Sequence, residues 1–354
     1  MASGTILKSK IFNILLICAF FSLAAPFAKA ATAEEPTKDP KERAKEVIME
    51  HISDSHSWPV ALPLMQEKHI PLPVILYSDK GLEVFSSDKI QEEGSVYAGV
   101  NYSYKLEGNK IKVVDASGKI DEAATKKVWD FSITRNVVSM FLSISILLIV
   151  FLSVSSAYRK REGKAPKGLQ SFLEPLIVFV RDDIAIPNVG YKYARFMPLL
   201  LTIFFFILIN NLMGMITLFP GGFNLTGNIA VTATLAVIIL FVVNLNGNKH
   251  YWKHIFVPDP WWLFPIMIPV EIVSIFSKPI ALMIRLFANI TAGHIVILSL
   301  ISLIFIFGTV WVSPVSVVFV VFMDCIELLV AFLQAYIFTL LSALFIGMAT
   351  MEHH

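Results

Sequence analysis

The sequence predicts an all-α polytopic membrane protein. It has about five membrane crossings, a long tilted C-terminal helical hairpin, and a small exported N-terminal segment with some β structure. Of the 354 residues, 56% are hydrophobic and only 16% are charged, whereas about a quarter of a typical soluble domain is charged. The apolar residues gather in long runs after residue 130, as membrane-spanning helices require. The net charge of +2 gives no reason to expect a nucleic-acid partner.

Residues 1–30 have the features of a secretory signal peptide. Lys8 and Lys10 precede an apolar stretch at 11–25, and the small-residue pattern Ala-Lys-Ala at 28–30 fits a cleavage site. We therefore expect the mature chain to begin just after this pattern, outside the inner membrane.

Residues 31–130 are polar and mixed, and the signal ahead of them indicates a small exported N-terminal extension. A charged helical start is expected at 38–50. The strand-like runs are 72–78, 82–86 and 110–115. The junction at 78–81, Ser-Asp-Lys-Gly, is typical of a hairpin turn. No metal site is predicted, because the spacing of the histidines matches no standard zinc pattern; they are His51, His56 and His69.

The first crossing is predicted at Val137 to Ala157, since at about 1.5 Å per residue this run spans ~30 Å of hydrocarbon. Trp129 marks its outer interface. Five cations follow it directly: Arg159, Lys160, Arg161, Lys164 and Lys167. The positive-inside rule places these cations in the cytoplasm, so the chain enters the membrane from outside.

Two further crossings follow a short apolar segment, 169–180. That segment contains Pro175 and is flanked by charges, so we expect it to lie along the cytoplasmic interface. The second and third crossings and the outside turn between them are 198–219, 228–245 and 220–222. The loop at 246–260 carries lysines and histidines that return it to the inside.

The last two apolar segments, 261–307 and 313–351, are each much longer than the ~20 residues of a perpendicular crossing. The first would reach ~70 Å as a continuous helix. It must be kinked, strongly tilted or divided, and Pro265, Pro269 and Pro279 offer places for bends. One crossing for each segment gives about five in all, with the mature N-terminus outside and the C-terminus inside.

Several polar side chains interrupt these two segments. An ionisable group at the centre of a span costs roughly 2.5 to 3.5 kcal/mol, so each needs a partner, an aqueous path or a function. The first segment contains Glu271, Lys278, Arg285, Asn289 and His294, and the second contains Asp324, Glu327 and Gln334.

Arg285 has no acidic residue within two turns on either side. Because a guanidinium stays protonated, Arg285 is a fixed positive charge that awaits a carboxylate from another helix or another chain. At 100° per residue, Glu271 lies within about 40° of the same helix face. A polar stripe therefore runs from Glu271 through Ser274 and Lys278 to Arg285 and Asn289.

His294 falls about 180° from Arg285 and so faces away from this stripe, toward the neighbouring segment. There, Asp324, Glu327, Gln334 and Ser342 form one helical stripe. An antiparallel hairpin would bring the two faces together. A histidine beside a carboxylate within the bilayer is suited to relaying protons, because imidazole changes charge near physiological pH.

Each polar residue also has a structural interpretation. Glu271 and Lys278 would serve equally as an internal ion pair or as side chains that snorkel to water. His294 and Glu327 would serve as a purely structural pair. Asp324 would face a water-filled vestibule.

One long motif favours a functional role over the structural interpretation for several of these residues. The segment 277–294, SKPIALMIRLFANITAGH, closely resembles the signature of subunit a of F-type ATP synthases. Three shorter segments support the resemblance: FFFILINNLMG at 204–214, NIAVT at 228–232 and LQAYIF at 333–338. The similarity runs from about residue 135 to the end, and the longer exported segment is the main departure from the family pattern.

The resemblance implies a membrane domain at 131–354 and a role for each polar residue. Arg285 matches the essential arginine that faces the ring of c subunits. Asn289, His294, Glu327 and Gln334 match the outer access path, and Glu271 matches the acid of the inner path. Some relatives carry the acid and the imidazole in swapped positions. Lys278, Ser274 and Asp324 are further candidates for lining the half-channels.

The family also implies a mechanism and partners. Two half-channels that do not meet would carry protons to and from the carboxylates of the c-ring, and the partners would be that ring, peripheral stalk subunit b, the remaining ATP synthase subunits and membrane lipid. The location would be a bacterial inner membrane. The chain has no GxxxxGK[ST] sequence, so nucleotide chemistry must belong to other subunits and no cofactor is expected.

Two other classes compete with this prediction. A self-contained proton-coupled transporter would bind substrate at its midplane charges, but no internal repeat favours it. An assembly or anchoring protein would leave the buried arginine, histidine and acids without a purpose. Co-purification of a ring of small hairpin subunits separates the first class from both alternatives.

Overall fold

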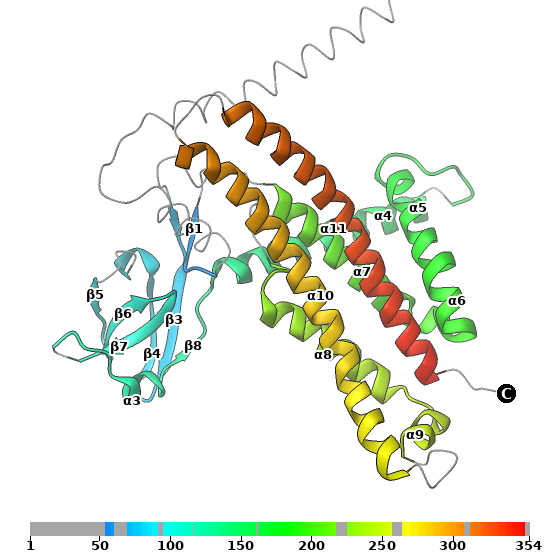
Figure 1. The fold of residues 1–354 in the computed structure, drawn as a ribbon, viewed down its shortest axis with the longest axis horizontal. Coiled ribbons are helices and arrows are strands. Elements are labelled where there is room, and N and C mark those ends of the chain that lie inside the picture. Colours follow the sequence, from blue (N-terminus) through cyan, green and yellow to red (C-terminus); the bar gives the residue numbers. More distant parts are fainter. Residues whose placement is uncertain are drawn as a thin grey trace, which may run out of the picture.

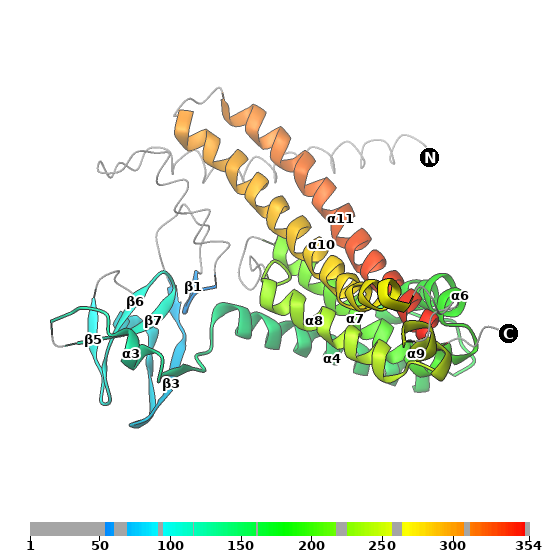
Figure 2. The ribbon, with the colours of Figure 1, turned by 60° about the horizontal axis from the view of Figure 1, so that its bottom comes forward.

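The structure is a computed structural model that describes residues 54–59, 69–90, 95–115, 117–160, 162–216, 225–256, 264–307 and 312–350. A small β domain lies at one end of a bundle of long helices (Figures 1 and 2). The expected signal peptide, the helical start at 38–50, His51 and the turn at 220–222 lie outside the described residues.

The β domain holds three small antiparallel sheets. The first pairs β1 (Ser57–Pro59) with β2 (His69–Pro71), and the second has the order β4-β3-β8. Its strands are β3 (Pro73–Ser78), β4 (Gly81–Ser86) and β8 (Trp129–Asp130). The third sheet has the order β5-β6-β7, with strands Val96–Ala98, Ser103–Glu107 and Lys110–Val114. A 3-10 turn, η1 (Ser87–Ile90), and the short helix α3 (Glu122–Thr125) complete the domain.

The predicted hairpin turn is confirmed. Ser78 pairs with Gly81, which leaves Asp79 and Lys80 as the two turn residues. Gly81 has φ of 125°, a conformation that a residue with a Cβ rarely adopts. The domain core forms where the inner face of the second sheet meets the third, and it contains Val74, Leu76, Phe85, Ile90, Tyr104 and Val113.

The helices begin with α4 (Arg135–Lys160) and end with α11 (Val312–Thr350). Between them lie α5 (Leu169–Phe179), η2 (Val180–Ala185), α6 (Ile186–Val189), η3 (Gly190–Lys192), α7 (Tyr193–Met215), α8 (Ile229–Leu245), α9 (Lys249–Phe256) and α10 (Phe264–Phe307). In the described ranges, four stretches are long and apolar enough to cross a membrane: 135–160, 169–215, 266–303 and 314–350. The 17-residue α8 is apolar but shorter, so the described residues hold four to five crossings, consistent with the prediction of about five.

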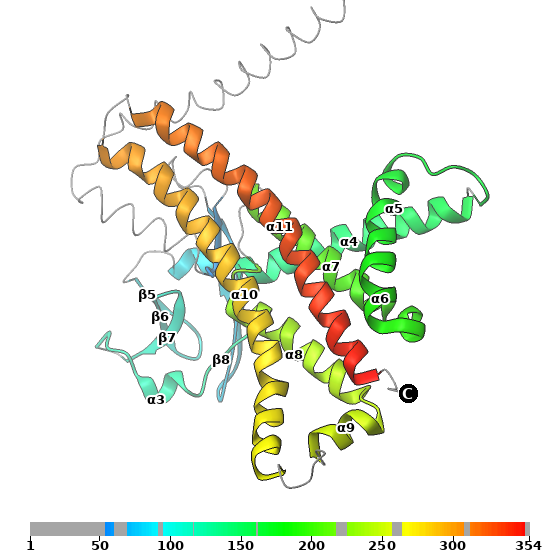
Figure 3. The same cartoon turned by 45° about the vertical axis from the view of Figure 1, so that its right-hand side comes forward.

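Two features of the helices refine the sequence prediction. The second crossing begins earlier than residue 198, because Pro198 is accommodated inside α7. The segment α5–α6 runs transverse to α4 (Figures 1 and 3), which is the direction expected of a helix along the membrane surface. α10 is one continuous 44-residue helix that contains Pro269 and Pro279, and it visibly changes direction along its length (Figure 3).

Candidate functional site

The polar residues of interest lie on α10 and α11, which run side by side as a long hairpin in all three views (Figures 1, 2 and 3). Apolar side chains hold the pair in place. Leu282, Leu286 and Ile290 of α10 are buried in the same core as Ala335 and Phe338 of α11. This packed stripe fixes the rotation of both helices, and so determines which polar residues meet and which face outward.

His294 and Glu327 meet across the hairpin, as the helical spacing predicts. Nε2 of His294 lies 3.9 Å from Oε1 of Glu327, and the two side chains are only 10% and 7% exposed. Gly293 makes room for this approach, because a Cβ at that position would lie 2.9 Å from the same carboxylate oxygen. The pair is therefore enclosed, and it combines a titratable base with a titratable acid at contact distance.

A second polar contact crosses the hairpin at Asn289. Its Nδ2 donates a hydrogen bond of 3.1 Å to Oε1 of Gln334. Gln334 is buried, whereas Asn289 is exposed on the outer face of α10. This hydrogen bond therefore connects the side of the hairpin that holds His294 and Glu327 to the exposed face of α10 that carries Arg285.

Arg285 is exposed on α10. Within the described ranges, no acidic side chain comes within ion-pair distance of its guanidinium, and no hydrogen bond from it is found. A fixed charge on an exposed helix face in a membrane is costly without a partner.

The first half of α10 carries the other predicted polar residues. Glu271, Ser274 and Lys278 are all half-buried, so the predicted stripe changes from partly covered to open as it approaches Arg285. Lys278 places its Nζ 5.5 Å from the ring centre of Phe345. Glu271 has interactions with other groups of the chain.

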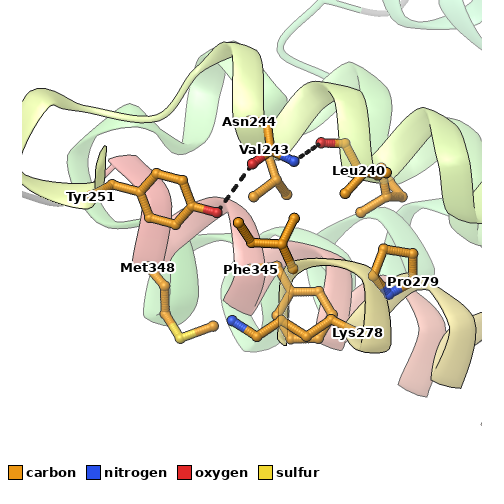
Figure 4. Close-up of a pocket in the computed structure, with 10 residues that line it drawn as sticks. Leu240, Val243, Asn244, Tyr251, Lys278, Pro279, Phe345 and Met348 are labelled. Atoms are coloured by element: carbon orange, nitrogen blue, oxygen red, sulfur yellow. Dashed lines mark hydrogen bonds between the residues drawn. The ribbon is translucent and has the colours of Figure 1, made fainter. Parts of the chain in front are cut away.

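Lys278 also lines a pocket between α8, α9, α10 and α11 (Figure 4). Asn244 and Tyr251 are two further polar residues of its lining, and the hydroxyl of Tyr251 donates to Oδ1 of Asn244 over 3.2 Å. Burial, together with the charge of Glu271, raises the pKa of Tyr251. The pocket therefore lies within electrostatic reach of Glu271.

The position of Asp324 differs from that of its stripe companions. Glu327, Gln334 and Ser342 are buried, but Asp324 is exposed at the edge of the stripe. Its carboxylate still interacts electrostatically with Glu327. This placement suits a residue at the entrance of a polar path better than one inside it.

The structure adds three polar residues to the candidate site that the sequence alone gives little reason to select. Arg135, at the start of α4, is only 3% exposed, and its charge acts on His294. Asn244 and Tyr251 come from the end of α8 and from α9. An arginine just ahead of an apolar run usually indicates only a helix end, so its burial and its effect on a distant histidine appear only in the tertiary structure.

The fold and these sites define an ion-translocating membrane subunit, with one enclosed acid–base pair, one open arginine and a mainly apolar pocket that Lys278, Asn244 and Tyr251 also line. Residues 137–347 match the family described as ATP synthase A chain, and the chain belongs to that family. Residues 47–131 match a family described only as a domain of unknown function, DUF8433.

Individual relatives are consistent with this family assignment. "ATP synthase subunit a" of Chloroherpeton thalassium is 50% identical over 227 residues, which cover 62% of this chain and 67% of the relative. "ATP synthase subunit a 2" of Prosthecochloris aestuarii is 49% identical over 229 residues, or 63% of this chain and 70% of the relative. "ATP synthase subunit a" of Myxococcus xanthus is 44% identical over 233 residues, or 64% and 75%. The family is the proton-translocating membrane component of F-type ATP synthase and is not catalytic on its own.

Proposed function

We propose that this chain forms two offset proton half-channels beside a ring of c subunits and couples proton flow to rotation of that ring. The observation that carries the proposal is the exposed Arg285, which has no acidic partner in the described part of the chain. An exposed cation on a membrane helix calls for a carboxylate from another subunit. A carboxylate that moves past it would satisfy the charge only transiently.

Arg285 would act on each ring carboxylate in turn. A protonated carboxyl group can face lipid, whereas an ionised one cannot do so cheaply. Arg285 stabilises the ionised form, so an approaching carboxyl group releases its proton to one half-channel and is reloaded from the other after it leaves. The fixed positive charge also repels a proton that would pass directly between the half-channels.

The outer half-channel would comprise His294, Glu327, Asn289 and Gln334, with Asp324 near its entrance. The enclosed contact of 3.9 Å between His294 and Glu327 supports proton exchange between them. The bond from Asn289 to Gln334 supports a polar connection onward to the ring-facing surface. Arg135 would set the electrostatic field at the histidine.

The inner half-channel would comprise Glu271, Ser274 and Lys278. The pocket that Lys278 lines, together with Asn244 and Tyr251, supports an aqueous approach from the side of α9 (Figure 4). Each proton that crosses a potential of 100 mV gains about 2.3 kcal/mol. Several such transfers must be summed by rotation to drive one ATP synthesis.

We further propose the chain's divisions, location and partners. The divisions are a signal peptide at 1–30, an exported extension at 31–130 and a membrane domain at 131–354. The two family matches, at 47–131 and 137–347, support only the boundary near residue 131. The cations after α4 favour a bacterial inner membrane with the N-terminus periplasmic and the C-terminus cytoplasmic. The partners would be the c-ring, peripheral stalk subunit b and lipid.

The decisive experiment measures ATP-driven proton pumping in inverted vesicles that carry Arg285→Ala. We expect pumping to be abolished while the c-ring still co-purifies. Arg159→Ala, which removes an arginine at the cytoplasmic end of α4, is the matched control and should pump normally. Normal pumping by Arg285→Ala in an assembled complex would overturn the proposal.

A further inference from the structure

The β domain has an apolar face that is not part of its core. On the outer side of the sheet β4-β3-β8, five large side chains are each more than half exposed: Tyr77, Leu82, Val84, Trp129 and Phe131. A typical soluble domain does not cluster so many exposed apolar groups without a function for them. This set is called the outer sheet face below.

Strand register places the five side chains together. Tyr77 lies opposite Leu82 on β4 and opposite Trp129 on β8. Two residues along, Ile75 lies opposite Val84, and its carbonyl accepts a hydrogen bond of 2.9 Å from the backbone N–H of Phe131. Directly opposed residues share one face of a sheet. The outer sheet face is therefore a continuous surface across all three strands.

The opposite side of the same sheet is already covered. Its alternate residues, Val74, Leu76 and Phe85, are buried against Tyr104 and Val113 of the sheet β5-β6-β7. The domain thus has a complete core of its own, so the outer sheet face must have another reason to be apolar.

The direction of this face follows from the layering. In Figures 1 and 2, β5, β6 and β7 lie on the far side of β3 from the long helices. Because the inner face of the sheet β4-β3-β8 points toward β5–β7, its outer face points toward the side of the molecule where the helices lie. That side is where α4 enters the membrane.

The sheet is also held close to the membrane. Beyond β8, the backbone N–H groups of Ile133 and Arg135 bond to the carbonyls of Pro73 and Ser55, over 3.1 and 2.9 Å. Asn136, already in α4, donates its backbone N–H to Oδ1 of Asp54 over 3.2 Å. These hydrogen bonds tie the first residues of α4 to the β domain, so the strand passes into the helix through a bonded connection.

We propose that the outer sheet face rests on the membrane itself, at the boundary between headgroups and acyl chains of the leaflet where α4 begins. Tryptophan and tyrosine concentrate at that depth because their rings are apolar and their N–H or O–H groups reach water. Leu82 and Val84 supply the apolar contact that such surface-lying elements use. Ten residues beyond Phe131 along the chain, Phe141 is the first exposed large apolar side chain of α4.

This lipid contact goes beyond the proposed proton path and does not depend on it. It holds the exported domain at a defined position on the bilayer surface. The domain then sits beside the membrane subunit as a rigid extension of α4.

The test uses spin labels on the assembled complex, otherwise free of cysteine and with Cys325→Ser, in lipid vesicles. One variant carries Val84→Cys on the outer sheet face. Its matched control carries Val100→Cys, an exposed valine on the connection between β5 and β6. Power saturation compares collisions of each label with oxygen, which concentrates in lipid, and with a water-soluble nickel chelate.

We expect the label at 84 to favour oxygen over nickel several-fold, and the label at 100 to show the reverse. Leu82→Cys provides a second label on the same face, in case the first variant fails to assemble. Nickel accessibility at 84 and 82 equal to that at 100 would overturn the proposal, because the face would then be in water. Shielding of these labels from both reagents would also overturn it, because a protein would then cover the face.

Discussion

Gly293 of α10 faces the carboxylate of Glu327, and its replacement by alanine tests the geometry of the proposed outer path. The added Cβ would lie 2.9 Å from Oε1 and 3.3 Å from Cδ, where ordinary contact begins at 3.4 Å. The carboxylate must therefore retreat by about 0.5 Å, which disturbs its 3.9 Å contact with His294. A misplacement of about 1 Å can cost ~100-fold in a positioned reaction, so half that shift should cost about ten-fold in rate.

The assay is ATP-driven proton pumping in inverted vesicles, with co-purification of the c-ring as the measure of assembly. Alanine has a higher helix propensity than glycine by about 0.8 to 1 kcal/mol, so a weaker α10 would not explain the loss. Glu327→Asp shortens the acid by one methylene and withdraws it from the added Cβ. The double variant should therefore pump faster than the product of the two single effects predicts.

Two results would refute this reasoning. Normal pumping by Gly293→Ala would mean that the position of the Glu327 carboxylate does not matter for transport. A double variant that follows the product of the single effects would mean that the alanine acts elsewhere in the helix.

Three further predictions concern single contacts. Asn289→Ala and Gln334→Ala should each slow pumping, and the double variant should be no slower than the worse single variant, because both remove the same hydrogen bond; vesicle pumping rates check this. Tyr104→Phe removes a hydrogen bond of 3.1 Å to Glu83 and should destabilise the β domain by about 1.5 to 3 kcal/mol, measured by hydrogen exchange of β6 in the intact complex. Burial disfavours the charged form of Asp130, but the imidazole of His56, 3.6 Å away, and a hydrogen bond from the backbone N–H of Ser132 lower its pKa overall. Ionised Asp130 should therefore stabilise the folded state at a pH above its unfolded pKa of about 3.9, and this stabilisation should be lost as the pH falls through its lower pKa in the folded state. In acid, the hydrogen-exchange rate of β3 in the wild type should therefore approach the rate in Asp130→Asn.

The membrane helices were predictable because lipid leaves the backbone few choices. Without water, a spanning segment must satisfy its own N–H and C=O groups, so a long apolar run becomes a helix. Once the segments are helical, the spacing of 100° per residue separates the face of Arg285 from that of His294. The same arithmetic groups Glu327 with Gln334, and both are indeed buried.

The other features of the fold and of the candidate site depend on contacts between segments that are distant in the sequence. The charge of Arg135 acts on His294 although the two residues lie far apart in the sequence. Tyr251 approaches Asn244 through the fold-back of α9. β8 consists of two residues that pair with β3, too short for an alternating pattern. In each case the local sequence is compatible with several environments.

The length of α10 explains how one helix can serve both sides of the membrane. Its 44 residues amount to ~66 Å of helix, roughly twice the ~30 Å of hydrocarbon, so it must lie strongly tilted. Glu271 and His294 are 23 residues apart, which corresponds to ~35 Å of helix. In a tilted helix, much of that separation lies in the membrane plane. The two proposed half-channels are therefore displaced sideways as well as in depth, with Arg285 between them, and a proton can pass from one to the other only on a carrier that moves laterally.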